Sequence, residues 1–293
     1  MGMRTDLAAE SCQRMTGNLP EGIRTHEEEF GALHIGTVII EQENAAEMLG
    51  KAMGRYTTIT GPSFCGAHRM TEGEIERIAE EIRRMLPPKG AVLVVGLGNN
   101  DITPDAVGAR TAHQVLATRH ISTDAARKMG APSLRECAVI APGVMGQTGI
   151  ETSEIARALG RDIRPAAVIV VDALAAGSIS RLGNTIQLSD SGIAPGSGVM
   201  NRRKELSEKT LGVPVVSIGV PTVVDAHTLA GDLLQQHDRA AEKHLLEPQG
   251  GSMMITPREV DVIISHASRV LAWAINKALH PGLSVGELAY LSG

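Results

Sequence analysis

The sequence predicts an α/β fold in which helices cover both faces of a twisted, largely parallel sheet. The runs Ala91–Val95 and Ala166–Val171 are short and almost wholly apolar, which is typical of strands buried on both faces. Segments with helical spacing lie between such runs, so that strand, loop and helix alternate along the chain. The 293 residues, 43% of them hydrophobic, can bury a sizeable core as one large domain or two small ones.

The first third of the chain is expected to supply one strand and two helices. Residues 1–32 are polar and contain three consecutive glutamates, so we expect a loosely held leader. The apolar, β-branched segment His34–Ile40 predicts the first strand. A short helix is expected over Asn44–Met53, followed by a turn-rich surface segment. Thr71 and Glu74 fit a capping box for a second helix, which a Pro-Pro pair then stops.

The middle of the chain continues the alternation. A helix is expected to begin at Asp105 or the next residue, and a strand is expected over Cys137–Ala141. Thr148 and Glu151 fit another capping box, for a helix that ends near Leu159.

The last third is expected to hold a long irregular region, one strand and one long helix. Residues 173–201 are rich in Gly and Ser, and Val213–Val220 is an apolar strand candidate. Thr256, Pro257 and Glu259 match the N-cap, N1 and N3 positions of a helix, and the apolar spacing that follows predicts packing against the core.

Composition excludes several classes of partner. Aromatic residues make up only 2% of the chain, so stacking platforms for nucleic-acid bases are scarce. The formal net charge is -5, and the basic cluster Arg202–Lys204 is short, which argues against a direct nucleic-acid partner. The three cysteines form no Cys-x-x-Cys pair, and neither a signal peptide nor a membrane span is evident. We therefore expect a cytoplasmic protein with no membrane partner.

Common catalytic and nucleotide-binding motifs are missing. Gly96-Leu97-Gly98 resembles the start of a dinucleotide fingerprint, but the sixth position is Asp101, whose charge would repel a pyrophosphate. The chain contains no P-loop, no H-E-x-x-H and no G-x-S-x-G sequence.

Two acidic residues follow the predicted central strands. Asp105 lies just beyond the loop after Ala91–Val95, and Asp172 directly follows Ala166–Val171. Because the carboxyl ends of parallel strands meet at one edge of a sheet, we expect the two side chains to lie close together. Two close carboxylates share one proton, so that one can donate it while the other activates water, as in an aspartic hydrolase.

Three other interpretations remain open at this point. In one, Asp105, Asp172 and a histidine such as His120 or His227 make the metal site of a metal-dependent peptidase; in a second, non-enzymatic version, the two acids hold a ligand in a binding or assembly module. Alternatively, Asp105 caps its helix and Asp172 satisfies loop amides.

Several segments, in order, resemble the spore germination protease family, and together they cover most of the chain. They are RTDLA near the start, GLGNNDITPDAVG from Gly96, TRH from Thr118, APGVMGQTGIET from Ala141, VVDALAA from Val170, GSGVMNRR from Gly196, LGVPVVSIGVPTVVDA from Leu211 and ITPREVD from Ile255. GLGN with Asp105 and Asp172 is more distantly similar to hydrogenase maturation proteases, which implies a three-layer α/β fold of that kind. Ala109 and Met200 depart from residues common in the family.

The resemblance implies an atypical aspartic-type endopeptidase, homotetrameric in the spore core, that degrades small acid-soluble spore proteins at germination. It places the two catalytic aspartates on Asp105 and Asp172 and implies no cofactor. It also implies a zymogen that cuts itself after Asp6. Residues 1–6 would then be a propeptide, and residues 7–293, starting at Leu7, a single peptidase domain.

Further residues are candidates for substrate binding. The glycines of the loop after Cys137–Ala141 could bring backbone N–H groups to a developing oxyanion. Acidic substrate sites, which the resemblance implies, would pair with arginines in bidentate fashion. These candidates are Gly143, Gly146, Gly149, Arg119, Arg202 and Arg203.

Overall fold

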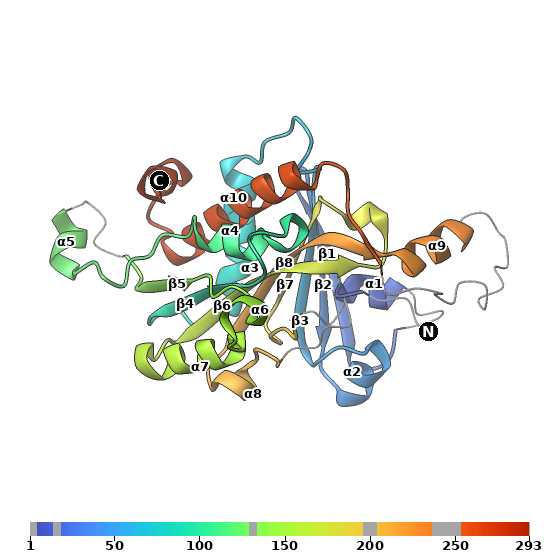
Figure 1. Ribbon diagram of the computed structural model, residues 1–293, viewed down its shortest axis with the longest axis horizontal. Coiled ribbons are helices and arrows are strands. Elements are labelled where there is room, and N and C mark those ends of the chain that lie inside the picture. The colour runs from blue at the N-terminus through green and yellow to red at the C-terminus, as the bar shows by residue number, and fades with distance from the viewer. Residues whose placement is uncertain (1–4, 14–18, 129–133, 196–203, 236–252, 293) are drawn as a thin grey trace.

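The computed structural model describes residues 5–13, 19–128, 134–195, 204–235 and 253–292, and within them nine strands form one sheet (Figure 1). The strand order is β1-β2-β3-β7-β8-β6-β4-β5, with β9 paired to β8. The strands are β1 (Ile23–Phe30), β2 (Leu33–Ile40), β3 (Gly54–Thr60), β4 (Val92–Gly96), β5 (Cys137–Ile140), β6 (Ala167–Ala176), β7 (Thr185–Ser189), β8 (Val215–Asp225) and β9 (Met254–Ile255).

The sheet has a parallel half and an antiparallel half. Strands β5, β4, β6 and β8 pair in parallel, as the alternation of strand and helix predicts. Strands β1, β2, β3 and β7 pair antiparallel with one another, and β7 continues antiparallel onto β8. The expected α/β class is confirmed, and an antiparallel half is added to the parallel sheet that the sequence predicts.

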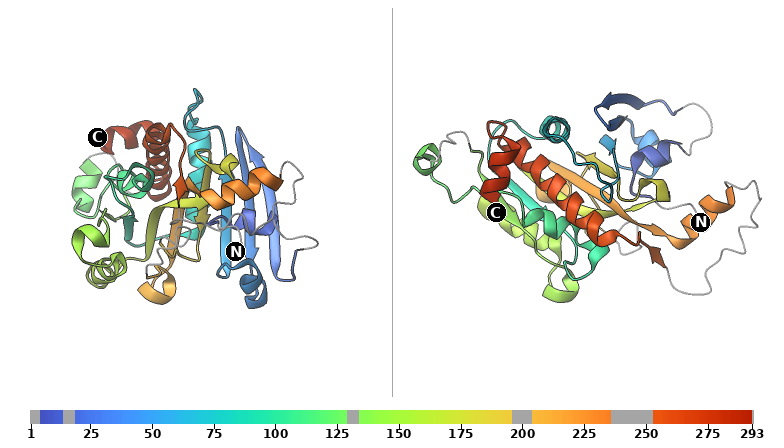
Figure 2. Two further views of the ribbon diagram at one scale, coloured as in Figure 1. Left: turned by 45° about the vertical axis from the view of Figure 1, so that its right-hand side comes forward. Right: turned by 90° about the horizontal axis from the view of Figure 1, so that it is seen from above.

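Helices cover both faces of the sheet and make three layers (Figures 1 and 2). On one face the long helix α10 packs beside α3 and α4 over the large core cluster. On the other face α7 packs over the parallel strands, while α1 and α2 pack over β2 and β3. The helices are α1 (Ala8–Gln13), α2 (Glu43–Leu49), α3 (Glu72–Met85), α4 (Val107–Ala112), α5 (Thr123–Lys128), α6 (Met145–Thr148), α7 (Thr152–Ile163), α8 (Glu208–Leu211), α9 (Ala226–Gln235), α10 (Val260–Leu279) and α11 (Val285–Ser292).

Of the three predicted helix caps, the structure confirms one. Thr71 and Glu74 form the capping box of α3, with the Glu74 N–H donating to Thr71 Oγ1 over 3.2 Å and the Thr71 N–H donating to Glu74 Oε2 over 2.8 Å. The box at Thr148 and Glu151 is wrong, because Thr148 ends α6 and α7 begins only at Thr152.

The third predicted cap, at the start of the long helix, is also wrong. The Thr256 hydroxyl donates to the Thr222 carbonyl over 2.8 Å, which ties it to β8 instead of to a helix. Helix α10 starts at Val260 with Glu259 as its N-cap residue.

Three segments that the sequence assigns to loops contain strands. The expected leader contains β1, an edge strand that pairs with β2 and whose side chains are largely exposed. The expected turn-rich surface segment after the first helix contains β3, which is largely buried between β2 and β7. The expected irregular region after Asp172 contains the last part of β6 and all of β7, both largely buried. Polar and small residues weaken the apolar pattern of these strands even where tertiary packing buries them.

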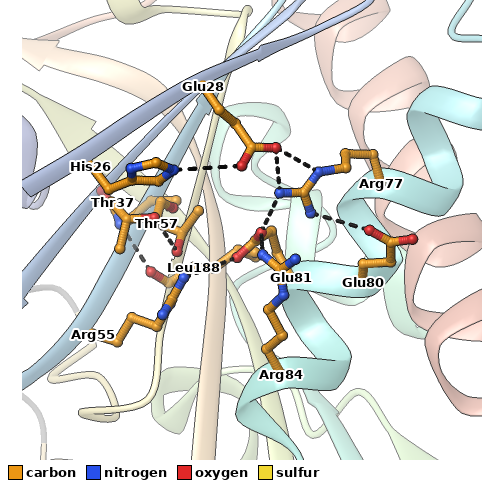
Figure 3. A network of polar contacts seen from close by, with 11 residues as sticks. His26, Glu28, Thr37, Arg55, Thr57, Arg77, Glu80, Glu81, Arg84 and Leu188 are labelled. Atoms are coloured by element: carbon orange, nitrogen blue, oxygen red, sulfur yellow. Dashed lines mark hydrogen bonds and ion pairs between the residues drawn. The ribbon is translucent and has the colours of Figure 1, made fainter.

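A network of charged side chains joins β1 to α3 (Figure 3). Arg77 on α3 donates to Glu28 Oε1 through Nε and Nη2, over 2.9 and 2.6 Å, and these hydrogen bonds hold the pKa of Glu28 below its usual value. Arg77 also pairs with the buried Glu81 over 2.7 Å, and Glu81 in turn contacts Arg84 and Arg55. Charged contacts thus help to attach the edge strand to α3.

No helix among the residues that the structure describes is long and apolar enough to span a bilayer.

Candidate active site

Asp105 is held beside the end of β4 by the loop between them. A short 3-10 turn, Thr103–Asp105, precedes α4, and the Asn99 N–H donates to Asp105 Oδ2 over 2.7 Å. Gly98 has φ 97°, and a Cβ there would lie 1.9 Å from the Asp105 carbonyl oxygen. Only glycine allows this approach. Asp105 does not cap α4, whose N-cap residue is Ala106.

Asp172 lies within β6, directly beside the loop that carries Asp105. The register pairs Gly96 with Val171, so Asp172 is level with the first residue after β4. Its side chain is buried, and Oδ1 accepts from the Ala173 N–H over 2.9 Å. Helix α4 presses against this point, because a Cβ on Gly108 would lie 2.2 Å from the Val171 carbonyl oxygen. The glycines near Asp105 therefore serve close packing of a loop and a helix on two strand ends, and not a dinucleotide.

One cavity of about 900 Å³ contains both aspartates. The parallel strands contribute Asp172 and Gly219, and the loop after β4 contributes Asp105. The antiparallel half contributes Tyr56 from β3 and Gln187 from β7. The cavity therefore lies where the two halves of the sheet meet, and both acids line it.

The N-terminal segment enters the same cavity. Asp6 lines it, and the Asp6 N–H donates to the Ala175 carbonyl over 3.0 Å. Leu7 is fully buried, and Glu10 on α1 accepts from the Gly177 N–H over 2.8 Å. The start of the chain is thus docked on the end of β6, against the expectation of a loose leader.

The comparisons with known proteins agree on one family. The family model described as Germination protease matches residues 4–238 and 228–291. The chain belongs to the germination protease family. It is 36% identical over 325 residues to a germination protease of Clostridium tetani, with all of both chains covered. It is 37% identical over 349 residues to one of Bacillus velezensis, covering 96% of this chain and 94% of that one.

Membership of this family makes the protein a peptidase, so its substrates are peptides or proteins. Among solved structures it is similar to a NiFe hydrogenase maturation protease, HycI from Thermococcus kodakarensis. The sequences are 18% identical, the match covers 68% of this chain and 98% of that chain, and the TM-score is 0.37.

The structure does not bring Arg119 into the cavity. Arg119 is exposed, and its N–H donates to the carbonyl of Cys137 at the start of β5, whereas the cavity lies at the ends of the strands. Arg202 and Arg203 lie outside the described residues.

The three glycines of the predicted oxyanion loop surround α6, next to the Asp105 loop. Gly143 and Gly149 have φ of 74° and 70°, and Gly149 ends α6 in the left-handed conformation. Gln147 Nε2 links α6 to Asn99 Oδ1 over 3.1 Å. None of these glycines, Gly146 included, is among the described residues that line the cavity. Tight turns account for Gly143 and Gly149 here.

A metal site is not formed by the described residues, in which no three His, Cys, Asp or Glu side chains are grouped to hold an ion. His120 is exposed and does not line the cavity. The His227 N–H donates to Asp225 Oδ1 over 3.1 Å at the start of α9.

Sequence reasoning missed Lys51, which projects into the cavity from beyond α2. Its ammonium donates to the Thr5 carbonyl over 3.0 Å. Gly50 gave a partial indication, because a glycine directly after a helix is typical of a left-handed helix end, where the chain turns sharply before the next residue. Nothing in the sequence says where that residue then points.

Proposed function

We propose that the protein is a spore germination endopeptidase in which Asp105 and Asp172 together activate water. One carboxylate takes a proton from the water that attacks the peptide carbonyl, and the other protonates the leaving amine. The observation that carries this proposal is that both side chains line one cavity of about 900 Å³, with Asp172 within β6 and Asp105 in the loop that follows the adjacent parallel strand β4.

The substrates are small acid-soluble spore proteins, and the protein acts as a homotetramer in the spore core. These parts of the proposal are supported by membership of the germination protease family and by the sequence segments quoted above. Backbone groups of the cavity would hold an extended segment of such a substrate.

The protein is made as a zymogen that cuts itself between Asp6 and Leu7. Two features support this: Asp6 lines the same cavity as the two catalytic aspartates, and its backbone is paired with β6. The segment on the amino-terminal side of the cut would thus block the cavity until it is released. Residues 1–6 are the propeptide, and the peptidase domain begins at Leu7.

The test is mass spectrometry of the full chain during incubation at mildly acidic pH, alone and with a small acidic spore protein. The wild type should gain a new terminus at Leu7 and cut the substrate. Asp105→Asn and Asp172→Asn should lower both rates by at least about 10²-fold, because each removes a proton-transfer group. Asp101→Asn is the matched control, because Asp101 is exposed, belongs to the same loop and does not line the cavity.

Three outcomes would overturn the proposal. If either Asn variant of the pair still processes itself at the wild-type rate, the catalytic assignment is wrong. If a chelator abolishes activity and added metal restores it, the aspartates act as metal ligands in a metallopeptidase. A wild-type chain that never cuts itself or any substrate would instead indicate a binding or assembly module.

A further inference from the structure

Strand β6 continues beyond its neighbour β4, and its open edge is occupied by the start of the chain. β4 ends at Gly96, opposite Val171, whereas β6 runs on to Ala176 and stays paired with β8 along its other edge. At Ala175 the carbonyl accepts from the Asp6 N–H over 3.0 Å, and the N–H donates to Asp6 Oδ2 over 2.8 Å. A single residue, Asp6, therefore satisfies both backbone groups of Ala175.

Lys51 enters the cavity and donates to the carbonyl of Thr5, the residue before Asp6. Helix α2 ends at Gly50 with φ 63°, and the N–H groups of Gly50 and Lys51 donate to the carbonyls of Glu47 and Ala46. This left-handed helix end turns the chain so that Lys51 reaches Thr5 and the cavity.

Charge in the cavity is unbalanced. Among the described residues that line it, Lys51 is the one cationic side chain. The carboxylates that line it are Asp6, Asp105, Asp172 and Glu205. An acidic side chain of a substrate would be repelled by these carboxylates, because like charges close together in a partly buried site cost energy. Among the described residues that line the cavity, Lys51 alone would attract it. The position of an acidic substrate residue is therefore restricted to one corner of the cavity.

We propose that Lys51 and the Ala175 N–H form a subsite for an acidic side chain of the substrate, on the amino-terminal side of the bond that is cut. Asp6 occupies this subsite in the uncut chain, and an incoming substrate strand would take over its pairing with Ala175. The inference rests on the proposed function, in that substrates enter this cavity and the chain is cut after Asp6. It assigns selectivity to Lys51 in place of Arg119, which does not line the cavity.

The test compares two peptides that differ only in Asp or Asn before the cut, with kcat and KM measured on the full chain. The wild type should cut the Asp peptide about tenfold more efficiently, as expected for one hydrogen-bonded charge pair. Lys51→Met should abolish this ratio, mainly through KM for the Asp peptide. Lys51→Arg keeps the charge and should retain most of it, and Lys51→Glu should favour a peptide with Lys at that position.

The control is Lys209→Met, because Lys209 is exposed on α8 and does not line the cavity; it should keep the wild-type ratio. The subsite is disproved if the wild type cuts both peptides equally, or if Lys51→Met keeps the preference.

A binding measurement separates this inference from the proposed function. Full chain carrying both Asp6→Asn and Asp105→Asn has a weakened occupant and lacks one proposed catalytic group. It should still bind the Asp peptide about tenfold more tightly than the Asn peptide, and adding Lys51→Met should remove the difference. Equal binding of both peptides overturns the subsite, whereas absence of cleavage by the wild type overturns only the peptidase chemistry.

Discussion

The two halves of the sheet are built differently and contribute different things to the cavity. The parallel half, β5-β4-β6-β8, is buried on both faces, and it supplies Asp172 from β6 and Asp105 from the loop after β4. The antiparallel half, β1-β2-β3-β7, ends in an exposed edge strand that a charge network attaches to α3. Helix α2 packs on this half, and Lys51 follows that helix. Helix α1 of the N-terminal segment packs over the same half.

Under the two proposals above, this difference assigns catalysis to the parallel half and substrate selection to the antiparallel half. In the parallel half, close backbone packing fixes the positions of the two acids, so small changes there should be costly. In the antiparallel half, long polar side chains make the contacts, so changes should alter selectivity or stability by smaller amounts.

The largest effect is expected where α4 packs against the parallel strands. Gly108→Ala would put a Cβ 2.2 Å from the Val171 carbonyl oxygen and 2.4 Å from that of Leu97, and neither backbone can move independently of the sheet. We expect a loss of about 3 kcal/mol or more in the free energy of unfolding in urea. Gly160→Ala in α7 meets no atom within 4 Å and should be neutral or stabilising. Equal stability of the two variants would show that the packing is loose.

The next effect concerns the loop that positions Asp105. Gly98→Ala adds a Cβ at φ 97° and 1.9 Å from the Asp105 carbonyl oxygen, so Asp105 must shift. If Asp105 is catalytic, kcat should fall by about 10²-fold, the scale of a 1 Å displacement of a reacting group. Gly212→Ala is the control, because it has φ 75° but no atom within 4 Å. Wild-type kcat in Gly98→Ala would argue against a role for Asp105.

A pH effect of about 2 kcal/mol is expected at the opposite end of the parallel half. His280 is buried against Arg135, and burial together with the positive charge of Arg135 lowers its pKa from 6.5 to about 4. The unfolded chain therefore protonates His280 below pH 6.5, whereas the folded chain protonates it only near pH 4. The free energy of unfolding should therefore fall by about 2 kcal/mol from pH 7 to pH 5.

The measurement is urea unfolding at both pH values. His280→Gln should remove most of the decrease, whereas substitution of the exposed His113 should leave it in place. A decrease that persists in His280→Gln would mean that another group carries it.

The smallest effect is expected at the charged edge of the antiparallel half. In a double-mutant cycle with Arg77→Met and Glu28→Gln, the coupling free energy should be about 1 kcal/mol, because Glu28 remains partly in water. The exposed pair Arg127–Asp124 should give about 0.3 kcal/mol or less. If Arg127–Asp124 coupled as strongly as Arg77–Glu28, the contact between β1 and α3 would be no stronger than an ordinary surface ion pair.

Apolar strands and their acids were predictable, whereas polar strands and their contacts were not. Runs of Val and Ile predict β4, β6 and β8. The alternation of strands and helices predicts that these strands are parallel, which places the residues after the runs, Asp105 and Asp172 among them, at one edge of the sheet. β1, β3 and β7 were missed because their sequences are mostly polar or charged, and the two or three apolar residues of β7 and β3 are too few to stand out from a loop. The cap at Thr148 failed because that residue ends α6, and the cap at Thr256 failed because its hydroxyl bonds to β8.

By itself, the sequence determined the α/β class, the family and the two acids of the parallel half, because burial on both faces demands apolar strands whose ends meet. Only the tertiary structure decided that Lys51 and Asp6 enter the same cavity as those acids. Their arrival depends on a helix end and an N-terminal segment packing against a strand more than 100 residues away in the chain. Contacts of that range leave no periodic trace in the residues that make them.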